Sequence, residues 1–275
     1  MRAAFVVILI TTLFNSAYSK DFFIYSPVGS YDKELNVESH KDITNFISSV
    51  LNRKIKLVTQ KNYYTLLENF KKGLVDIAFL GPLAYAILKT EFKDYEPIVT
   101  ILSEDGTPFY RCFLVRAFDS SEDPKTFTKI ALTNPYSTCG YFGVKMILEK
   151  YGLDIDEYRY DFLESHDIVA TEVLLKNYDA GGLKDTVFKR YERLLLKIVG
   201  HSDYIPEHLI IVNKKSFSED DVKILRERFA SLTSSDTAEW LIGKYGFYPY
   251  FEENYEKIEK LVKSEAYYDF FKKNR

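Results

Sequence analysis

The sequence contains few of the residues that build cross-linked or metal-dependent folds. Only two cysteines and four histidines occur among its 275 residues, and two cysteines are too few for a disulfide-built scaffold. The histidines show no paired ligand spacing, so we expect neither a metal site nor a cofactor. The formal net charge is −3, which leaves no basic excess of the kind that a nucleic-acid surface needs.

Long apolar runs are absent beyond the first residues of the chain. An apolar stretch at residues 3–13 follows Arg2, and the small residues Ala17 and Ser19 precede Lys20. This pattern predicts a secretory signal peptide at residues 1–19, cleaved after Ser19, because the stretch is short for a membrane span of about 30 Å. A retained signal anchor is the alternative. We expect a periplasmic protein whose mature net charge is −4, since cleavage removes only Arg2 from the charged residues.

Apolar and aromatic residues are plentiful. Apolar residues make up 46% of the chain and aromatic residues 16%, with 22 tyrosines. This composition supports a full hydrophobic core and argues against disorder. Tyrosine offers an apolar face and a polar tip, which suits a binding cleft as well as a core.

Strand-like and helix-like segments alternate along the chain, which predicts an α/β fold. Two such sets suggest two lobes, each a mixed, mostly parallel sheet flanked by helices. We place a two-strand hinge at residues 109–115 and 207–212. Lobe 1 then comprises residues 20–109 with 207–275, and lobe 2 comprises residues 110–206.

The segment from Ser218 onward is expected to be helical, with its aromatic side chains packed against lobe 1. The expected strands are residues 22–25, 54–58, 75–80, 129–133 and 178–180, and the expected helices include 42–51, 62–73, 141–151 and 166–176.

Two turns between a strand and a helix carry the clearest functional signal. Residues 134–140 read Asn-Pro-Tyr-Ser-Thr-Cys-Gly, and Gly81 and Pro82 follow the strand at 75–80. Ligands bind at the carboxyl ends of strands in open α/β sheets. Hydroxyl groups beside the free N–H groups of a first helical turn form a neutral, donor-rich socket for an anion. Plain helix capping by Ser137 and Thr138 is the alternative.

Several motifs together resemble one known family. They are Gly-Leu-Val-Asp-Ile-Ala-Phe-Leu-Gly-Pro-Leu-Ala-Tyr at residues 73–85, Ser-Thr-Cys-Gly at 137–140, Ser-His-Asp at 165–167, Asp-Ala-Gly at 179–181 and Tyr-Gly-Phe at 245–247. In this order they resemble the phosphonate- and phosphite-binding periplasmic proteins of ABC transporters. The resemblance covers residues 22–258. It implies two α/β lobes that close on a ligand.

The resemblance also implies a set of ligand-binding residues. Each has a structural alternative, because tyrosines in this Tyr-rich chain and single histidines commonly serve packing. The implied set is Tyr63, Gly81, Pro82, Tyr110, Ser137, Thr138, Cys139, Gly140, His166 and His208.

The chain departs from the family pattern at two places. Cys139 replaces the third hydroxyl of the socket, and a thiol is a weaker, softer donor. His208 lies near a position where aminophosphonate binders carry an acid, and the second such position falls near Asp185 or Thr186. A small tetrahedral oxyanion (phosphonate, phosphite or phosphate) therefore fits better than an aminoalkyl phosphonate. The sequence leaves open whether Cys112 and Cys139 form a disulfide or whether Cys139 is a free thiol in the site.

Three functions are compatible with these residues. The favoured one is a monomeric solute-binding protein, not an enzyme, that delivers the oxyanion to an ABC transporter permease. The second is a periplasmic oxyanion sensor that signals to a membrane histidine kinase, with a Cys139 thiol suited to an arsenic oxyanion. A remote third is a Cys-His hydrolase using Cys139 and His166, although the chain has no Gly-x-Ser-x-Gly elbow.

Overall fold

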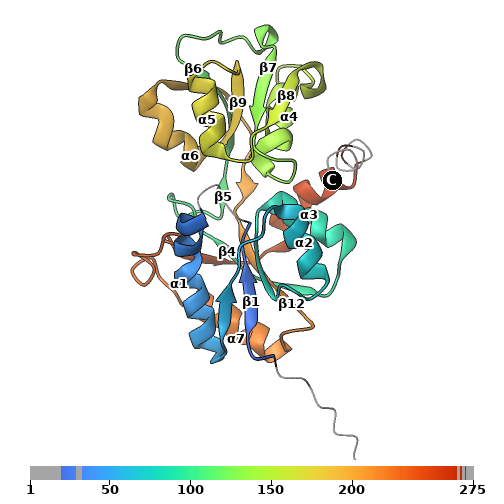
Figure 1. Ribbon diagram of the computed structural model, residues 1–275, viewed down its shortest axis with the longest axis vertical. Coiled ribbons are helices and arrows are strands. Elements are labelled where there is room, and N and C mark those ends of the chain that lie inside the picture. The colour runs from blue at the N-terminus through green and yellow to red at the C-terminus, as the bar shows by residue number, and fades with distance from the viewer. Residues whose placement is uncertain (1–19, 29–32, 265–266, 268–269, 271–275) are drawn as a thin grey trace, which may run out of the picture.

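Two separate β-sheets form the two lobes of the protein, with a short two-stranded connection between them (Figure 1). The computed structural model describes residues 20–28, 33–264, 267 and 270. The predicted signal peptide at residues 1–19 lies outside this range. Within the described residues, no helix combines the length and the apolar character needed to cross a membrane.

The first lobe is built on a six-stranded sheet flanked by helices. The sheet has the order β13-β4-β12-β3-β1-β2, in which β1 pairs in parallel with β2 and β3, and the other pairings are antiparallel. Its strands are β1 (Phe23–Ser26), β2 (Ile55–Leu57), β3 (Ile77–Leu80), β4 (Tyr95–Ile101), β12 (Leu209–Asn213) and β13 (Phe247–Pro249). Its helices are α1 (Lys33–Leu51), α2 (Tyr63–Lys71), α3 (Pro82–Glu91), α7 (Glu219–Ala230) and α8 (Glu256–Val262).

The second lobe is built on a five-stranded sheet that one continuous segment of the chain supplies. Its order is β10-β6-β9-β7-β8, with parallel pairing of β7 to β8 and β9 and antiparallel pairing elsewhere. The strands are β6 (Cys112–Ala117), β7 (Lys129–Leu132), β8 (Arg159–Phe162), β9 (Ala180–Lys184) and β10 (Leu196–His201). The helices are α4 (Gly143–Glu149), α5 (His166–Leu174) and α6 (Asp185–Tyr191), and 3₁₀ turns occur in both lobes at Pro124–Thr126, Ile155–Glu157, Glu192–Leu194 and Glu252–Asn254.

Two short strands connect the lobes. β5 (Phe109–Tyr110) and β11 (Ile205–Pro206) pair antiparallel as a separate two-stranded ribbon. β5 lies between the two lobes in Figure 1. The second crossing therefore lies at residues 205–206, just before the segment 207–212 that the sequence suggested, and β12 belongs wholly to the first sheet.

The predicted two-lobed α/β architecture is confirmed, and its details differ in three places. Antiparallel pairings outnumber parallel ones in the two lobe sheets, because the strands that follow a lobe crossing run through the sheet in the opposite direction. The strand expected at 178–180 is β9, which includes Gly181 and Gly182. A Cβ atom on Gly182 would lie 2.3 Å from the carbonyl oxygen of Cys139. The strand therefore packs directly against the turn at residues 137–140, which we call the socket turn.

The third difference concerns the segment after Ser218, which is only partly helical. It contains α7, a stretch of turns and the edge strand β13 before α8. Phe229 and Phe247 pack at 4.7 Å between ring centroids, which anchors this segment to the first lobe. The last described residues instead reach the second lobe, where the Phe270 ring stacks on Tyr141 at 3.9 Å and Tyr267 packs against Phe142.

Candidate ligand-binding site

A cavity of about 350 Å³ lies between the lobes and is lined by residues of both. The lining includes eight of the ten residues predicted from the sequence. These are Tyr63, Gly81, Tyr110, Ser137, Thr138, Cys139, His166 and His208. Pro82 and Gly140 are not part of the lining, although each adjoins it in the chain.

The first-lobe side of the cavity is formed where β3 ends and α3 begins. Gly81 is the N-cap of α3, and Pro82 takes the first helical position, where its missing N–H is not needed. A Cβ atom on Gly81 would lie 3.4 Å from His208 Nε2 and 3.5 Å from the Tyr63 hydroxyl oxygen. Both polar atoms therefore gather around a backbone position that has no side chain of its own.

The second-lobe side is formed by the turn after β7. Residues Thr138–Phe142 make a wide π-helical turn, and Gly140 leaves helical geometry with φ −78° and ψ −128°. The regular helix α4 starts only at Gly143, later than the sequence predicted. A Cβ atom on Gly140 would lie 2.8 Å from the carbonyl oxygen of Asn134, so the turn closes tightly on itself at this residue.

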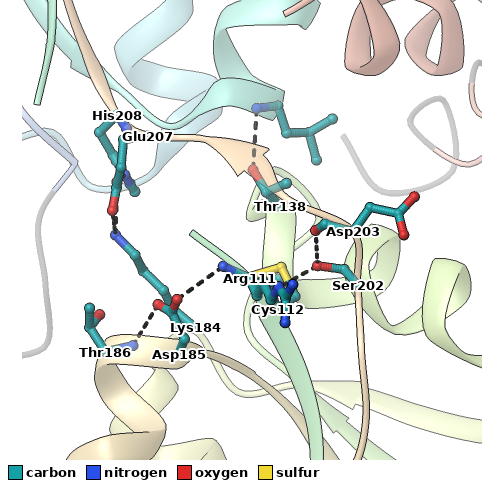
Figure 2. The surroundings of a disulfide bond; sticks show 12 residues. Arg111, Cys112, Thr138, Lys184, Asp185, Thr186, Ser202, Asp203, Glu207 and His208 are labelled. Carbon is teal, nitrogen blue, oxygen red and sulfur yellow. Dashed lines mark hydrogen bonds and ion pairs between the residues drawn. A yellow bond between two sulfur atoms is a disulfide. The ribbon is translucent and has the colours of Figure 1, made fainter. Parts of the chain in front are cut away.

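Direct contacts connect the two sides. The Leu83 backbone N–H of α3 donates a hydrogen bond to Thr138 Oγ1 at 3.3 Å, drawn as the dashed line at Thr138 in Figure 2. The rings of Tyr63 and Tyr136 stack across the lobes with centroids 6.3 Å apart. The structure therefore has the two lobes closed on each other around the cavity.

Cys139 is joined to Cys112 by a disulfide bond (Figure 2). Of the two alternatives that the sequence left open, the structure has the disulfide. A thiolate ligand for arsenic and a Cys139 nucleophile both need a free thiol, so these two interpretations of Cys139 are wrong for this structure. Its side chain instead fastens the socket turn to the first residue of β6.

Two buried polar atoms along the cavity have no hydrogen-bond partner among the residues that the structure describes. They are Thr133 Oγ1 and His166 Nδ1. Thr133 is only 1% exposed, at the end of β7, and buried polar groups are nearly always hydrogen-bonded. These two atoms are therefore available to a ligand that fills the cavity.

Burial keeps the histidines and tyrosines of the cavity lining in their neutral forms. Burial, with help from Lys184, lowers the pKa of His166 to about 4. The pKa of His208 is also lowered by burial, although its hydrogen bond to Glu207 opposes the shift. Burial raises the pKa of Tyr63 to about 12 and that of Tyr110 well above its ordinary value. At neutral pH the cavity wall thus presents phenol hydroxyls and neutral imidazoles.

The sequence did not point to a charged pair behind the cavity wall. Lys184, at the end of β9, places its Nζ 2.6 and 2.8 Å from the two carboxylate oxygens of Glu207 (Figure 2). Burial alone would raise the pKa of Glu207, but Lys184 and His208 outweigh it and hold this pKa far below its usual range. Lys184 could have been found by the rule that led to Gly81, since it lies at the carboxyl end of a parallel strand.

Other lining residues were also missed by the sequence interpretation. Arg190 and Asp167 form an ion pair with 3.0 Å between Arg190 Nη2 and Asp167 Oδ1. Glu164 adopts φ +64°, and although its side chain is exposed, partial burial of its carboxyl group raises the pKa of that group. The remaining members are Val28, Thr133, Asn134, Ser165 and Val187.

Comparisons with known proteins agree with this geometry. A family model described as the phosphonate periplasmic substrate-binding protein of ABC transporters matches residues 25–255. The chain belongs to this family. Among curated proteins, the phosphate-import protein PhnD of Mycolicibacterium smegmatis is 25% identical over 162 residues, which cover 54% of this chain. The match spans half the length of that relative.

Solved structures of similar proteins share the fold of the phosphonate-binding family. PhnD1 from Prochlorococcus marinus, in complex with methylphosphonate, is 14% identical with a TM-score of 0.77, covering 90% of this chain and 99% of its own. XAC2383 from Xanthomonas citri, bound to ATP, is 15% identical with a TM-score of 0.74, covering 91% and 99%. The aliphatic sulphonate-binding protein SsuA of Escherichia coli is 12% identical with a TM-score of 0.58, covering 89% and 87%.

A stack of rings links the site to the core of the first lobe and makes stability depend on pH. His40 Nδ1 lies 2.9 Å from the Tyr25 hydroxyl, and its ring packs edge-on against Phe79, which stacks on His208. Burial, with a contribution from His208, lowers the pKa of His40 to about 3. The unfolded chain, with a histidine pKa near 6.5, therefore binds more protons than the folded chain below neutral pH.

We expect His40 to contribute about 2 kcal/mol to the loss of unfolding free energy between pH 7 and pH 5. Stability is retained above pH 6.5 and falls as the pH drops toward 3, because only the unfolded state gains the proton. Urea denaturation of the wild type and of His40→Gln at both pH values measures this contribution. The variant should lose less stability on acidification, whereas His201→Gln, at an exposed histidine, should behave as the wild type. Equal pH dependence in all three proteins would contradict the assignment.

Proposed function

We propose that the protein binds a small tetrahedral phosphorus oxyanion (a phosphonate, phosphite or phosphate) in the periplasm and delivers it to an ABC transporter permease. The observation that carries the proposal is the cavity between the lobes, with donors gathered on both sides and two buried polar atoms that have no partner in the described part of the chain. An oxyanion supplies the acceptors that these donors lack. The names of the relatives, PhnD for phosphate import and PhnD1 with methylphosphonate, favour the same ligand class.

The proposed ligand contacts follow from the two sides of the cavity. Ser137, Thr138 and Cys139 line the cavity from lobe 2, with Thr138 held against α3. Tyr63 and His208 approach from lobe 1, at the side-chain-free surface of Gly81. These preorganised neutral donors select the anion by matching hydrogen bonds.

The proposal also covers organisation and delivery. We propose lobe boundaries at residues 20–109 with 207–275 and at 110–206, which the pairing of Phe109 with Pro206 in the hinge ribbon supports. Membership of a transporter family favours delivery to a permease over signalling to a histidine kinase. That the protein acts as a monomer without catalytic activity, and that its signal peptide is cleaved after Ser19, stay predictions.

Calorimetric titration of the mature protein with phosphate, phosphite and methylphosphonate tests the proposal. At least one of these ions should bind, and Ser137→Ala should weaken that ion about tenfold or more, because a hydrogen bond to a charged group contributes about 1.5–3 kcal/mol. Ser231→Ala provides the matched control, since Ser231 is exposed at the end of α7 and distant from the cavity lining. If none of the ions binds, the protein is not an oxyanion receptor. Unchanged affinity in Ser137→Ala would show that the Ser137 hydroxyl of the socket turn does not bind the ligand.

A further inference from the structure

The carboxylate of Glu207 has all its acceptor positions occupied by the protein itself. Its side chain is 2% exposed. Oε1 accepts from Lys184 and lies 2.8 Å from Ser103 Oγ, whose single hydrogen is shared between Glu207 and the Phe109 carbonyl, and Oε2 accepts from Lys184 and from the His208 backbone N–H at 3.0 Å. His208 Nδ1 lies a further 3.1 Å from Oε2. A carboxylate offers about four lone-pair directions, so no acceptor remains for a ligand.

Lys184 and His208 separate this carboxylate from the cavity. Both residues line the cavity, whereas Glu207 does not. Lys184 comes from lobe 2, and Glu207 is held on the side of lobe 1 by Ser103 and by the Tyr255 hydroxyl, which donates to the Glu207 carbonyl. The ammonium also lies 4.5 Å from the centre of the Tyr110 ring. Lys184 therefore occupies the place beside Glu207 that a positively charged ligand group would otherwise take.

We propose that Lys184 acts as a built-in ammonium that restricts the site to tetrahedral oxyanions with an uncharged substituent or none. This inference rests on the proposed function and narrows it to a ligand class. An ammonium on the ligand would have to displace Lys184 from Glu207 or remain unpaired beside a like charge, and both are costly in a buried site. Lys184 has three donor hydrogens and directs two at Glu207, which leaves one for a ligand oxygen.

The acidic residues at the edge of the cavity do not offset this restriction. Asp167 is paired with Arg190 and also accepts a hydrogen bond from the Tyr191 hydroxyl at 2.9 Å. Glu164 is exposed to solvent, where an ion pair contributes little. The charge balance of the buried part of the cavity is thus set by Lys184 and Glu207.

Two phosphonates of nearly equal size measure the effect of a positive charge on the ligand. n-Propylphosphonate and 2-aminoethylphosphonate differ in a terminal methyl against an ammonium group. Calorimetric titration of the wild type should show n-propylphosphonate binding about a hundredfold more tightly, as expected for an unpaired buried charge. Lys184→Ala should reduce this ratio at least tenfold, because the ligand's ammonium can then reach Glu207. Lys184→Met, which keeps the apolar stem and removes the charge, should change the ratio in the same direction.

Lys189→Ala is the matched control. Lys189 lies on α6 and forms its own ion pair with Glu104 of the other lobe at 2.7 Å, but both side chains are more than half exposed. This variant should keep the wild-type ratio. Equal affinity of the wild type for the two phosphonates, or an unchanged ratio in both Lys184 variants with folding confirmed by circular dichroism, would overturn the inference alone. A wild type that binds no phosphonate and no phosphate would overturn the proposed function and the inference with it.

Discussion

Replacing both Cys112 and Cys139 by serine is expected to lower the free energy of unfolding by about 3–4 kcal/mol. The two residues are 27 positions apart in the sequence, and a cross-link over that distance removes much of the freedom of the unfolded chain. The disulfide also joins the strand β6 to the socket turn. Gly143 of α4 packs against it so closely that a Cβ atom there would lie 2.8 Å from Cys112 Sγ.

Urea denaturation with and without dithiothreitol measures this contribution. The reductant should destabilise the wild type by about the same amount as the double substitution and should leave the Cys112→Ser, Cys139→Ser protein unchanged. Since Cys139 lies in the socket turn, the double variant should also bind oxyanions more weakly. A variant as stable as the oxidised wild type would show that the turn is held by packing alone.

Glu207→Gln is expected to lower the free energy of unfolding of the ligand-free protein by about 2–3 kcal/mol. The substitution keeps the size of the side chain but leaves the Lys184 ammonium without its counter-ion. The estimate lies below the cost of breaking a fully buried pair, because the Lys184 side chain remains 15% exposed and can turn toward water in the cavity.

The exposed pair between the same two lobes provides the comparison. Glu104→Gln breaks the ion pair with Lys189, and we expect it to change the unfolding free energy by no more than about 0.5 kcal/mol. Urea denaturation at neutral pH measures both variants. Equal effects of the two substitutions would mean that Lys184 finds an alternative partner and that burial of the pair adds nothing.

Local patterns in the sequence predicted the architecture and eight of the residues that line the cavity. The strand β3 is buried throughout and runs directly into Gly81 and Pro82, so periodicity and turn chemistry specify it together. The socket turn was recognisable for the same reason. Site residues that lie in one short, continuous segment can be predicted in this way, because the segment's own sequence specifies its conformation.

Contacts between distant segments could not be predicted. The Lys184–Glu207 pair requires the end of β9 to lie opposite the residue that follows the hinge strand β11, and no local pattern encodes that alignment. The pairing of Cys112 with Cys139 likewise depends on how β6 and the socket turn meet in space. For both pairs the residue types were visible in the sequence, but their separation in space was not.

The order of strands in the first sheet constrains how the chain can fold. β12 lies between β3 and β4, yet its residues are synthesised only after the whole second lobe. Until then β3 and β4 each have an unpaired, apolar edge, which invites association with other chains. The second-lobe sheet uses residues 112–201 alone and can form first. Folding from the inserted lobe outward is therefore the order that this connectivity favours.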